Sequence, residues 1–76
     1  MTNENKLRGR MAEMGYNLTS LSEAISISRP ALRKRLANTS DFRVSEIERV
    51  CDVLQIPKKD VSVYFFSPDV PVLETK

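Results

Sequence analysis

The stretch LTSLSEAISISRPALRKRL, residues 18–36, decides how the chain folds. Apolar residues recur at helical spacing on both sides of a short break at Ser26 and Ile27, which predicts two helices joined by a tight turn. The second helix carries a cluster of basic residues: Arg29, Arg33, Lys34 and Arg35. A helix pair with cations on the outside of its second member is the arrangement with which many proteins enter the DNA major groove.

The first helix of this pair is expected to begin at Asn17 or Thr19, because either side chain can accept a hydrogen bond from a free amide of the first turn. The apolar spacing predicts its buried face, which consists of Leu18, Leu21, Ala24 and Ile25. In the second helix Ser28 is the expected N-cap, and Pro30 lies in the first turn, where a missing amide proton costs nothing. Its inward residues are Leu32 and Leu36.

Three more helices are predicted around this pair. Residues 4–14 place Leu7, Met11 and Met14 on one face, and Gly15 is a candidate left-handed cap. After a polar loop, Ser45 and Glu48 fit a capping box that opens a fourth helix. The inner face of that helix is expected to hold Ile47, Val50, Cys51 and Leu54. A short fifth helix is expected from Lys58 to about Phe65.

The sequence therefore predicts an all-α fold of five short helices in a compact bundle. We expect one domain over residues 1–66 and an extended or flexible tail over residues 67–76. With one cysteine and no histidine, a zinc or iron–sulfur site is close to excluded, and no cofactor is expected. No paired carboxylates or phosphate loop suggest an enzyme. No signal peptide or membrane span is evident, so we expect a cytoplasmic protein.

The charge is unevenly distributed along the chain. Residues 1–43 hold eight basic and four acidic groups, a balance of +4, whereas residues 44–76 hold four basic and six acidic groups, a balance of −2. A basic first part suits a protein that turns one face toward a polyanion. The alternative is that these charges only keep the surface solvated.

The sequence resembles the Cro/repressor (XRE-like) helix-turn-helix family, and most closely the short Cro-like repressors of temperate phages. The similarity covers about residues 5–66, and the positions that carry it are Lys6, Leu7, Arg8, Gly9, Arg10, Met11, Met14, Gly15, Tyr16, Leu21, Ala24, Ile25, Ile27, Ser28, Arg29, Leu32, Leu36, Ser40, Asp41, Phe42, Ser45, Glu46, Ile47, Val53, Leu54, Ile56, Tyr64, Phe65 and Phe66. The resemblance implies a sequence-specific DNA-binding transcriptional repressor in the cytoplasm of a bacterial host. Its expected partner is double-stranded operator DNA, which it binds as a homodimer.

By position, the resemblance assigns base reading in the major groove to Arg29, Pro30, Arg33 and Lys34. Contacts to DNA phosphates are assigned to Asn17, Thr19, Ser28, Arg35, Thr39, Ser40 and Arg43. Three aromatic residues in succession cannot all face inward from one helix, so a dimer interface is expected near the C-terminus. Its candidate residues are Tyr64, Phe65, Phe66, Val70 and Val72.

Two residues depart from the family pattern. Ser26 stands where a turn glycine is common, and a positive φ there would cost serine on the order of 1 kcal/mol. Leu18 stands where the family often has a glutamine that contacts phosphate; it can pack inward or form an apolar surface spot. These departures, with Pro30, keep an alternative open: an antirepressor or modulator that binds a second repressor protein instead of operator DNA.

Overall fold

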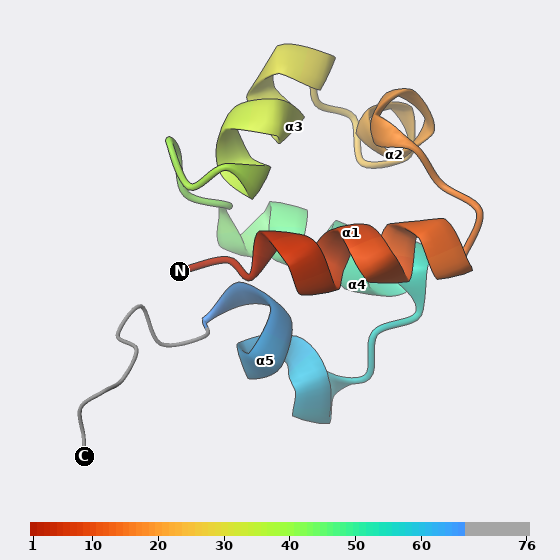
Figure 1. Cartoon of the computed structure of the whole chain (residues 1–76), viewed down its shortest axis with the longest axis vertical. Coiled ribbons are helices and arrows are strands. Elements are labelled where there is room, and N and C mark those ends of the chain that lie inside the picture. The colour runs from red at the N-terminus through yellow and green to blue at the C-terminus, as the bar shows by residue number, and fades with distance from the viewer. Residues whose placement is uncertain (67–76) are drawn as a thin grey trace.

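The computed structural model describes residues 1–66, and all the regular structure in that range is helical. Its elements in chain order are α1 (Glu4–Glu13), α2 (Leu18–Ala24), α3 (Arg29–Leu36), α4 (Val44–Leu54), the 3₁₀ turn η1 (Lys58–Asp60) and α5 (Val61–Phe65). Figure 1 shows α2 and α3 on one side of α1 and α5 on the other, with α4 behind. The prediction of an all-α fold with five short helices is confirmed, while the predicted tail, residues 67–76, lies outside the described residues.

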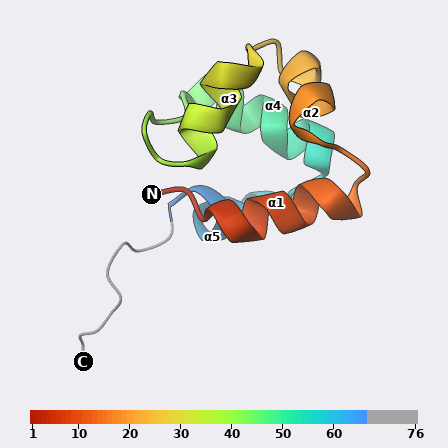
Figure 2. The same cartoon turned by 45° about the horizontal axis from the view of Figure 1, so that its top comes forward.

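The helices form two layers around a small apolar core. Figure 2 shows α1 and α5 in one layer and α2, α3 and α4 in the other. All five helices and the segment after α4 supply buried side chains, which are Leu7, Met11, Leu21, Ile25, Leu32, Leu36, Val50, Leu54, Ile56 and Phe65. Because so few residues fill the core, each of them supports the position of several helices.

The buried face of α2 differs from the predicted one at Ala24, which is exposed. Ser22 is buried instead, and its hydroxyl donates a hydrogen bond of 2.8 Å to the carbonyl oxygen of Thr19. Ser22 lies about 200° around the helix from Ala24 at 3.6 residues per turn. The buried stripe is therefore shifted from the midpoint of Leu21 and Ile25 toward Ser22, which leaves Ala24 outside it.

Four helices end in the same way, with one residue in the left-handed conformation. These residues are Gly15, Ser26, Asn38 and Gln55, with φ of 80°, 63°, 64° and 54°. In each case the amide of the next residue donates to a carbonyl five positions earlier; for α2 the bond from Ile27 to Ser22 is 3.0 Å. This pattern is the Schellman motif, which satisfies carbonyls that the helix leaves free. The predicted role of Gly15 is confirmed.

The N-termini confirm two predicted caps and correct a third. The side chain of Asn17 accepts from the amide of Ser20 at 2.8 Å, and the hydroxyl of Ser28 accepts from the amide of Ala31 at 3.2 Å. However, the N-cap of α4 is Arg43 and not Ser45, and the helix begins at Val44. Its capping carboxylate is that of Glu46, which accepts a bond of 2.9 Å from the amide of Arg43. The prediction of a Ser45–Glu48 capping box is wrong, because the earlier start puts Glu46 in the third helical position.

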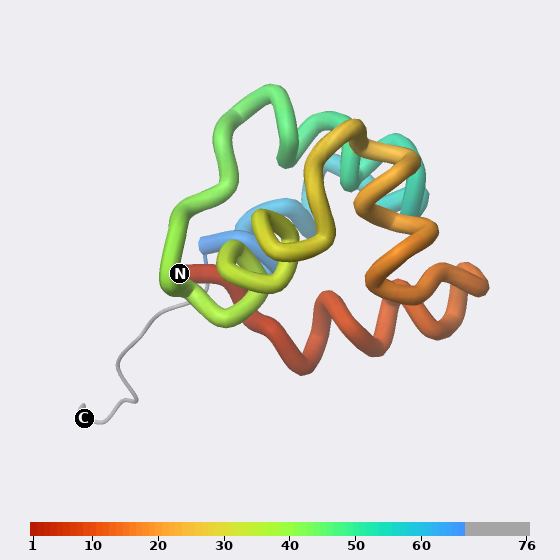
Figure 3. The backbone as a smooth tube through the Cα atoms, turned by 90° about the horizontal axis from the view of Figure 1, so that it is seen from above, coloured from red at the N-terminus to blue at the C-terminus, as the bar shows by residue number. Residues whose placement is uncertain are grey.

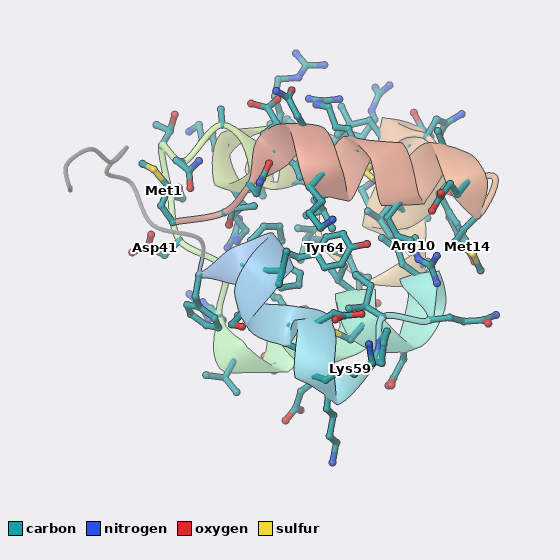
Figure 4. The ribbon with its side chains drawn as sticks, turned by 60° about the horizontal axis from the view of Figure 1, so that its bottom comes forward. Met1, Arg10, Met14, Asp41, Lys59 and Tyr64 are labelled. Carbon is teal, nitrogen blue, oxygen red and sulfur yellow. The ribbon has the colours of Figure 1, made fainter. Side chains whose placement is uncertain are left out.

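Two arginines hold the C-terminal ends of other helices. The guanidinium of Arg10 donates to the carbonyl oxygens of Leu54 at 2.9 Å and Gln55 at 2.8 Å, and in Figure 4 it lies below α1 beside the segment that follows α4. Arg49 donates at 3.1 Å to the carbonyl oxygen of Ile25 at the end of α2. A cation at a helix C-terminus is favourable because the carbonyl end of the helix carries partial negative charge. These arginines therefore help to fix the relative positions of the helices.

Residues before α1 connect both ends of the described chain. The amide of Asn3 donates to the carbonyl oxygen of Tyr64 at 2.8 Å. The ring of Tyr64 lies between α1 and α5 in Figure 4, and the ammonium of Lys6 is 5.2 Å from the ring centroid. Phe65 meets Phe42 edge to face, with 5.2 Å between ring centroids. These contacts close the core beneath the helix-turn-helix.

Candidate nucleic-acid interface

The position of α3 is set by its inner side. Leu32 and Leu36 are fully buried, and α3 packs directly against α2. Seen from above in Figure 3, α3 lies in the middle of the molecule, with α1 and the loop that follows α3 on either side. The left-handed turn at Ser26 and the cap at Ser28 fix where α3 starts. The outer side of α3 is thereby held at the surface as a rigid helix face.

That outer side carries the residues predicted to read bases. Arg29, Pro30, Arg33 and Lys34 are all exposed, in agreement with the outward orientation expected from the helical spacing. Within residues 1–66, none of the three cations forms an ion pair with an acidic side chain. Arg29 donates only a long bond of 3.4 Å to the Thr19 hydroxyl. The face therefore presents uncompensated positive charge, which suits a polyanion.

Arg35 lies apart from this cluster. Its Nε donates to a carboxylate oxygen of Glu46 at 2.7 Å, and a terminal nitrogen donates to the carbonyl oxygen of Ala31 at 3.1 Å. The side chains of Arg35 and Glu46 are 15% and 8% exposed. The pair joins α3 to the start of α4, so the charge of Arg35 is already compensated within the protein.

The other predicted phosphate contacts lie at the N-termini of α2 and α3 and in the loop between α3 and α4. Asn17, Thr19 and Ser28 are exposed at the N-termini of α2 and α3, although the side chains of Asn17 and Ser28 already accept from backbone amides. Thr39 is exposed and Ser40 half-buried in the loop that follows α3, and Arg43 is exposed where α4 begins. The fold thus gathers residues from three segments around one helix.

One contact at this interface was not predicted. The side-chain oxygen of Asn38 accepts from the amide of Thr2, and its side-chain nitrogen donates to the carbonyl oxygen of Thr2, both at 2.9 Å. This pair fixes the start of the loop that holds Thr39 and Ser40. The tolerance of asparagine for positive φ hinted at a helix end there, but no local pattern indicated its partner 36 residues away.

The candidate dimer residues have different environments. Phe65 is 3% exposed and belongs to the core, so its assignment to an interface is wrong. Tyr64 is half-buried, whereas Phe66 is 60% exposed. Val70 and Val72 lie outside the described residues. The expectation that at least one aromatic ring stays at the surface is thus met by Phe66.

Comparison with known protein families agrees with this geometry. A family model described as Cro/C1-type HTH DNA-binding domain matches residues 6–66, which is most of the chain. The chain belongs to the Cro/C1-type helix-turn-helix family. Its α2 and α3 are the helix-turn-helix of this Cro/C1-type domain, and the domain is that of a DNA-binding regulator.

Other comparisons add nothing to this assignment. Neither the curated proteins nor the solved structures yield a match to the Cro/C1-type chain.

In residues 1–66, no helix has the length and apolar character needed to cross a membrane. The same residues contain no group of three or more histidine, cysteine, aspartate and glutamate side chains arranged to hold a metal ion.

Proposed function

We propose that this Cro/C1-type chain is a transcriptional repressor of phage Cro type, which binds an operator and excludes RNA polymerase from the promoter. The observation that carries the proposal is the outer side of α3, where the cations Arg29, Arg33 and Lys34 are exposed and unpaired by acidic groups in the described structure. The protein acts in the cytoplasm of the bacterial host, where the operator is accessible.

In this proposal, Arg29, Arg33 and Lys34 donate to base edges in the major groove. Guanine presents two acceptors there, and each good arginine or lysine contact contributes about 1–3 kcal/mol of discrimination. Pro30 has no donor and contacts bases through its apolar ring, for instance against a thymine methyl. Asn17, Thr19, Ser28, Thr39, Ser40 and Arg43 hold the phosphates, with a smaller role for Arg35 because Glu46 already occupies its guanidinium.

The repressor works as a homodimer on two half-sites. Phe66 supports this part of the proposal, because an exposed aromatic ring in a small domain suits a subunit contact. Tyr64, Val70 and Val72 complete the proposed interface. If the two copies of α3 lie about 34 Å apart, the half-sites are separated by one turn of DNA.

A protein-binding antirepressor is the competing function, and the structure removes part of its support. Leu18 is half-buried and packs against the core, so it does not form the apolar surface spot that would attract a partner regulator. Ser26 adopts the left-handed conformation that the family's turn glycine would adopt. Both departures from the family pattern are therefore compatible with a normal helix-turn-helix.

Selection of bound sequences from random duplex DNA at two salt concentrations tests the proposal. We expect a motif with inverted half-sites and an affinity that falls steeply with salt, because each neutralised phosphate releases counterions. Weak binding without sequence preference would reject the repressor and favour the antirepressor. A motif with a single half-site would retain the DNA-reading role and reject the dimer.

A further inference from the structure

A second surface of the domain is a groove between α4, η1 and α5, with a volume of about 320 Å³. Its apolar lining consists of Val44, Ile47, Cys51, Ile56, Val61 and Phe66, and its rim carries Glu48, Asp52 and Lys58. None of these residues belongs to α2 or α3. The groove is therefore separate from the surface proposed to read DNA.

The groove is only partly shielded by the residues around it. Val44 is 74% exposed and Phe66 is 60% exposed, so two large apolar side chains face solvent at its border. Its volume is at the lower end of the range for sites that bind small molecules, about 300–1,000 Å³. A groove of this size admits one or two apolar side chains of an extended segment.

The sequence that follows the groove supplies such a segment. Phe66, the last described residue, lines the groove, and the next ten residues are SPDVPVLETK. They contain the apolar run Val70-Pro71-Val72-Leu73 between the acidic residues Asp69 and Glu74. In an extended chain successive side chains point to opposite sides, so Pro71 and Leu73 share one side and Val70 and Val72 share the other.

We propose that this segment docks in the groove of its own chain, with Leu73 and Pro71 inserted and Val70 and Val72 facing outward beside Phe66. The outward valines then belong to the surface offered to a second copy, as in the proposed dimer. Lys58 on the rim provides a cation for one of the acidic residues that flank the apolar run, whereas Glu48 and Asp52 on the same rim carry charge of the same sign as those residues. Apolar burial, and not charge, therefore drives the docking. The docking itself does not rest on DNA binding.

The short connection favours the chain's own segment over that of another molecule. From Phe66 to Leu73 the chain spans at most about 23 Å at roughly 3.3 Å per residue, and it starts at the groove. A short flexible connection gives a tethered segment an effective concentration on the order of millimolar. A free second copy at micromolar concentration competes poorly with such a segment for the same contacts.

Cys51 is the natural reporter of docking, because it is the only cysteine of the sequence and lines the groove. Burial raises the pKa of its thiol, and the neighbouring Asp52 raises it further, so alkylation is slow enough to follow. The test measures the rate of Cys51 alkylation by iodoacetamide at fixed pH in the full chain. The variants are Leu73→Ser, which removes the inserted side chain, and the matched control Val72→Ser, which changes an outward one. All rates are measured on dilute, monomeric protein, because Val72 also belongs to the proposed dimer interface.

Burial of one leucine shifts the equilibrium between the docked and the undocked segment by a factor on the order of ten. We therefore expect Leu73→Ser to accelerate alkylation by about that factor, while Val72→Ser leaves the rate unchanged. Equal rates in Leu73→Ser and the unsubstituted protein would overturn the proposal. Equal acceleration by both variants would also overturn it, because the proposed alternation would then be wrong. The circular dichroism of each variant shows whether the helices are intact.

The occupant is identified by nuclear Overhauser contacts between the Leu73 methyls and those of Ile47 and Val61. In a sample that mixes labelled and unlabelled protein, we expect these contacts only within one chain. Contacts of these methyls between chains would show that a second copy fills the groove and would overturn the intramolecular proposal. Both results can be obtained without DNA, so failure of docking and failure of operator recognition are distinguishable.

Discussion

The outer side of α3 and the groove between α4, η1 and α5 are built on one core but offer opposite chemistry. The first displays cations on a single helix, and the second is an apolar hollow with charges of both signs on its rim. Helical periodicity accounts for the first, because Leu32 and Leu36 turn inward while Arg33 and Lys34 turn outward. The groove depends on the packing of three elements. A small domain can thus carry two independent surfaces.

The largest expected effect is on operator affinity, when cations are removed from α3 and not from the groove side. Replacing Arg33 and Lys34 with alanine removes two base contacts, and we expect operator binding to weaken by about 2–6 kcal/mol, which is roughly 30-fold or more. The matched control is Lys58→Ala with Lys59→Ala, which removes two cations from the groove side and is expected to leave operator affinity nearly unchanged.

Fluorescence anisotropy on the selected operator measures both double variants. Thermal denaturation should show little change for Arg33→Ala with Lys34→Ala, because both side chains are exposed. If the two double variants lose equal affinity, the contribution of α3 is only general electrostatic attraction, and the base-reading assignment fails.

A change in the core should impair both surfaces together. Leu32 is fully buried, and its replacement by alanine is expected to lower the free energy of unfolding by about 2–5 kcal/mol. Urea denaturation measures this loss, and Val63→Ala, at an exposed position of α5, serves as the control with little effect. A stable Leu32→Ala protein that has lost only DNA binding would contradict a shared core.

The ion pair between Arg35 and Glu46 should contribute more to the stability of the fold than to DNA affinity. Glu46→Ala leaves a mostly buried guanidinium without its carboxylate and removes the acceptor at the start of α4, so we expect a loss of about 3 kcal/mol. Glu46→Gln should lose less, because an amide oxygen can still accept both hydrogen bonds. The free energies come from urea denaturation. Equal losses in the two variants would show that the missing negative charge, and not the missing hydrogen-bond acceptor, sets the cost.

The smallest expected effect is at the turn between α2 and α3. Ser26 has a φ of 63°, and glycine removes the steric cost of that conformation while adding freedom to the unfolded chain. We expect Ser26→Gly to stabilise the domain by about 0.5 kcal/mol, with operator affinity unchanged. Ser26→Ala keeps the Cβ atom and should give no gain by differential scanning calorimetry. If both variants are stabilised, the gain comes from loss of the serine hydroxyl and not from relief of the positive φ.

Much of the fold could be predicted from the sequence because its determinants are local. Helical spacing located Leu32 and Leu36 inside and Arg33 outside, and Asn17 and Ser28 marked helix starts through their own side chains. These features depend on neighbours within about one turn, which a single sequence displays directly.

The errors arose where distant residues compete for a position. The start of α4 depends on Glu46, which also pairs with Arg35 eleven positions earlier. Asn38 finds its partner in Thr2, and Phe65 finds its partner in Phe42. The groove likewise requires η1 and α5 to lie against α4. Single-sequence patterns contain no signal for such pairings, because they are set by tertiary packing.

The bond between Asn3 and Tyr64 has a consequence for synthesis of the protein. It joins the first helix to the last described one, across nearly the whole described chain. Contacts of long sequence separation form only after the intervening chain exists, and translation proceeds from the N-terminus. The helix-turn-helix is therefore complete in sequence well before Phe65 emerges to cover the core, and a nascent chain that stops short of α5 exposes apolar surface to proteases and chaperones.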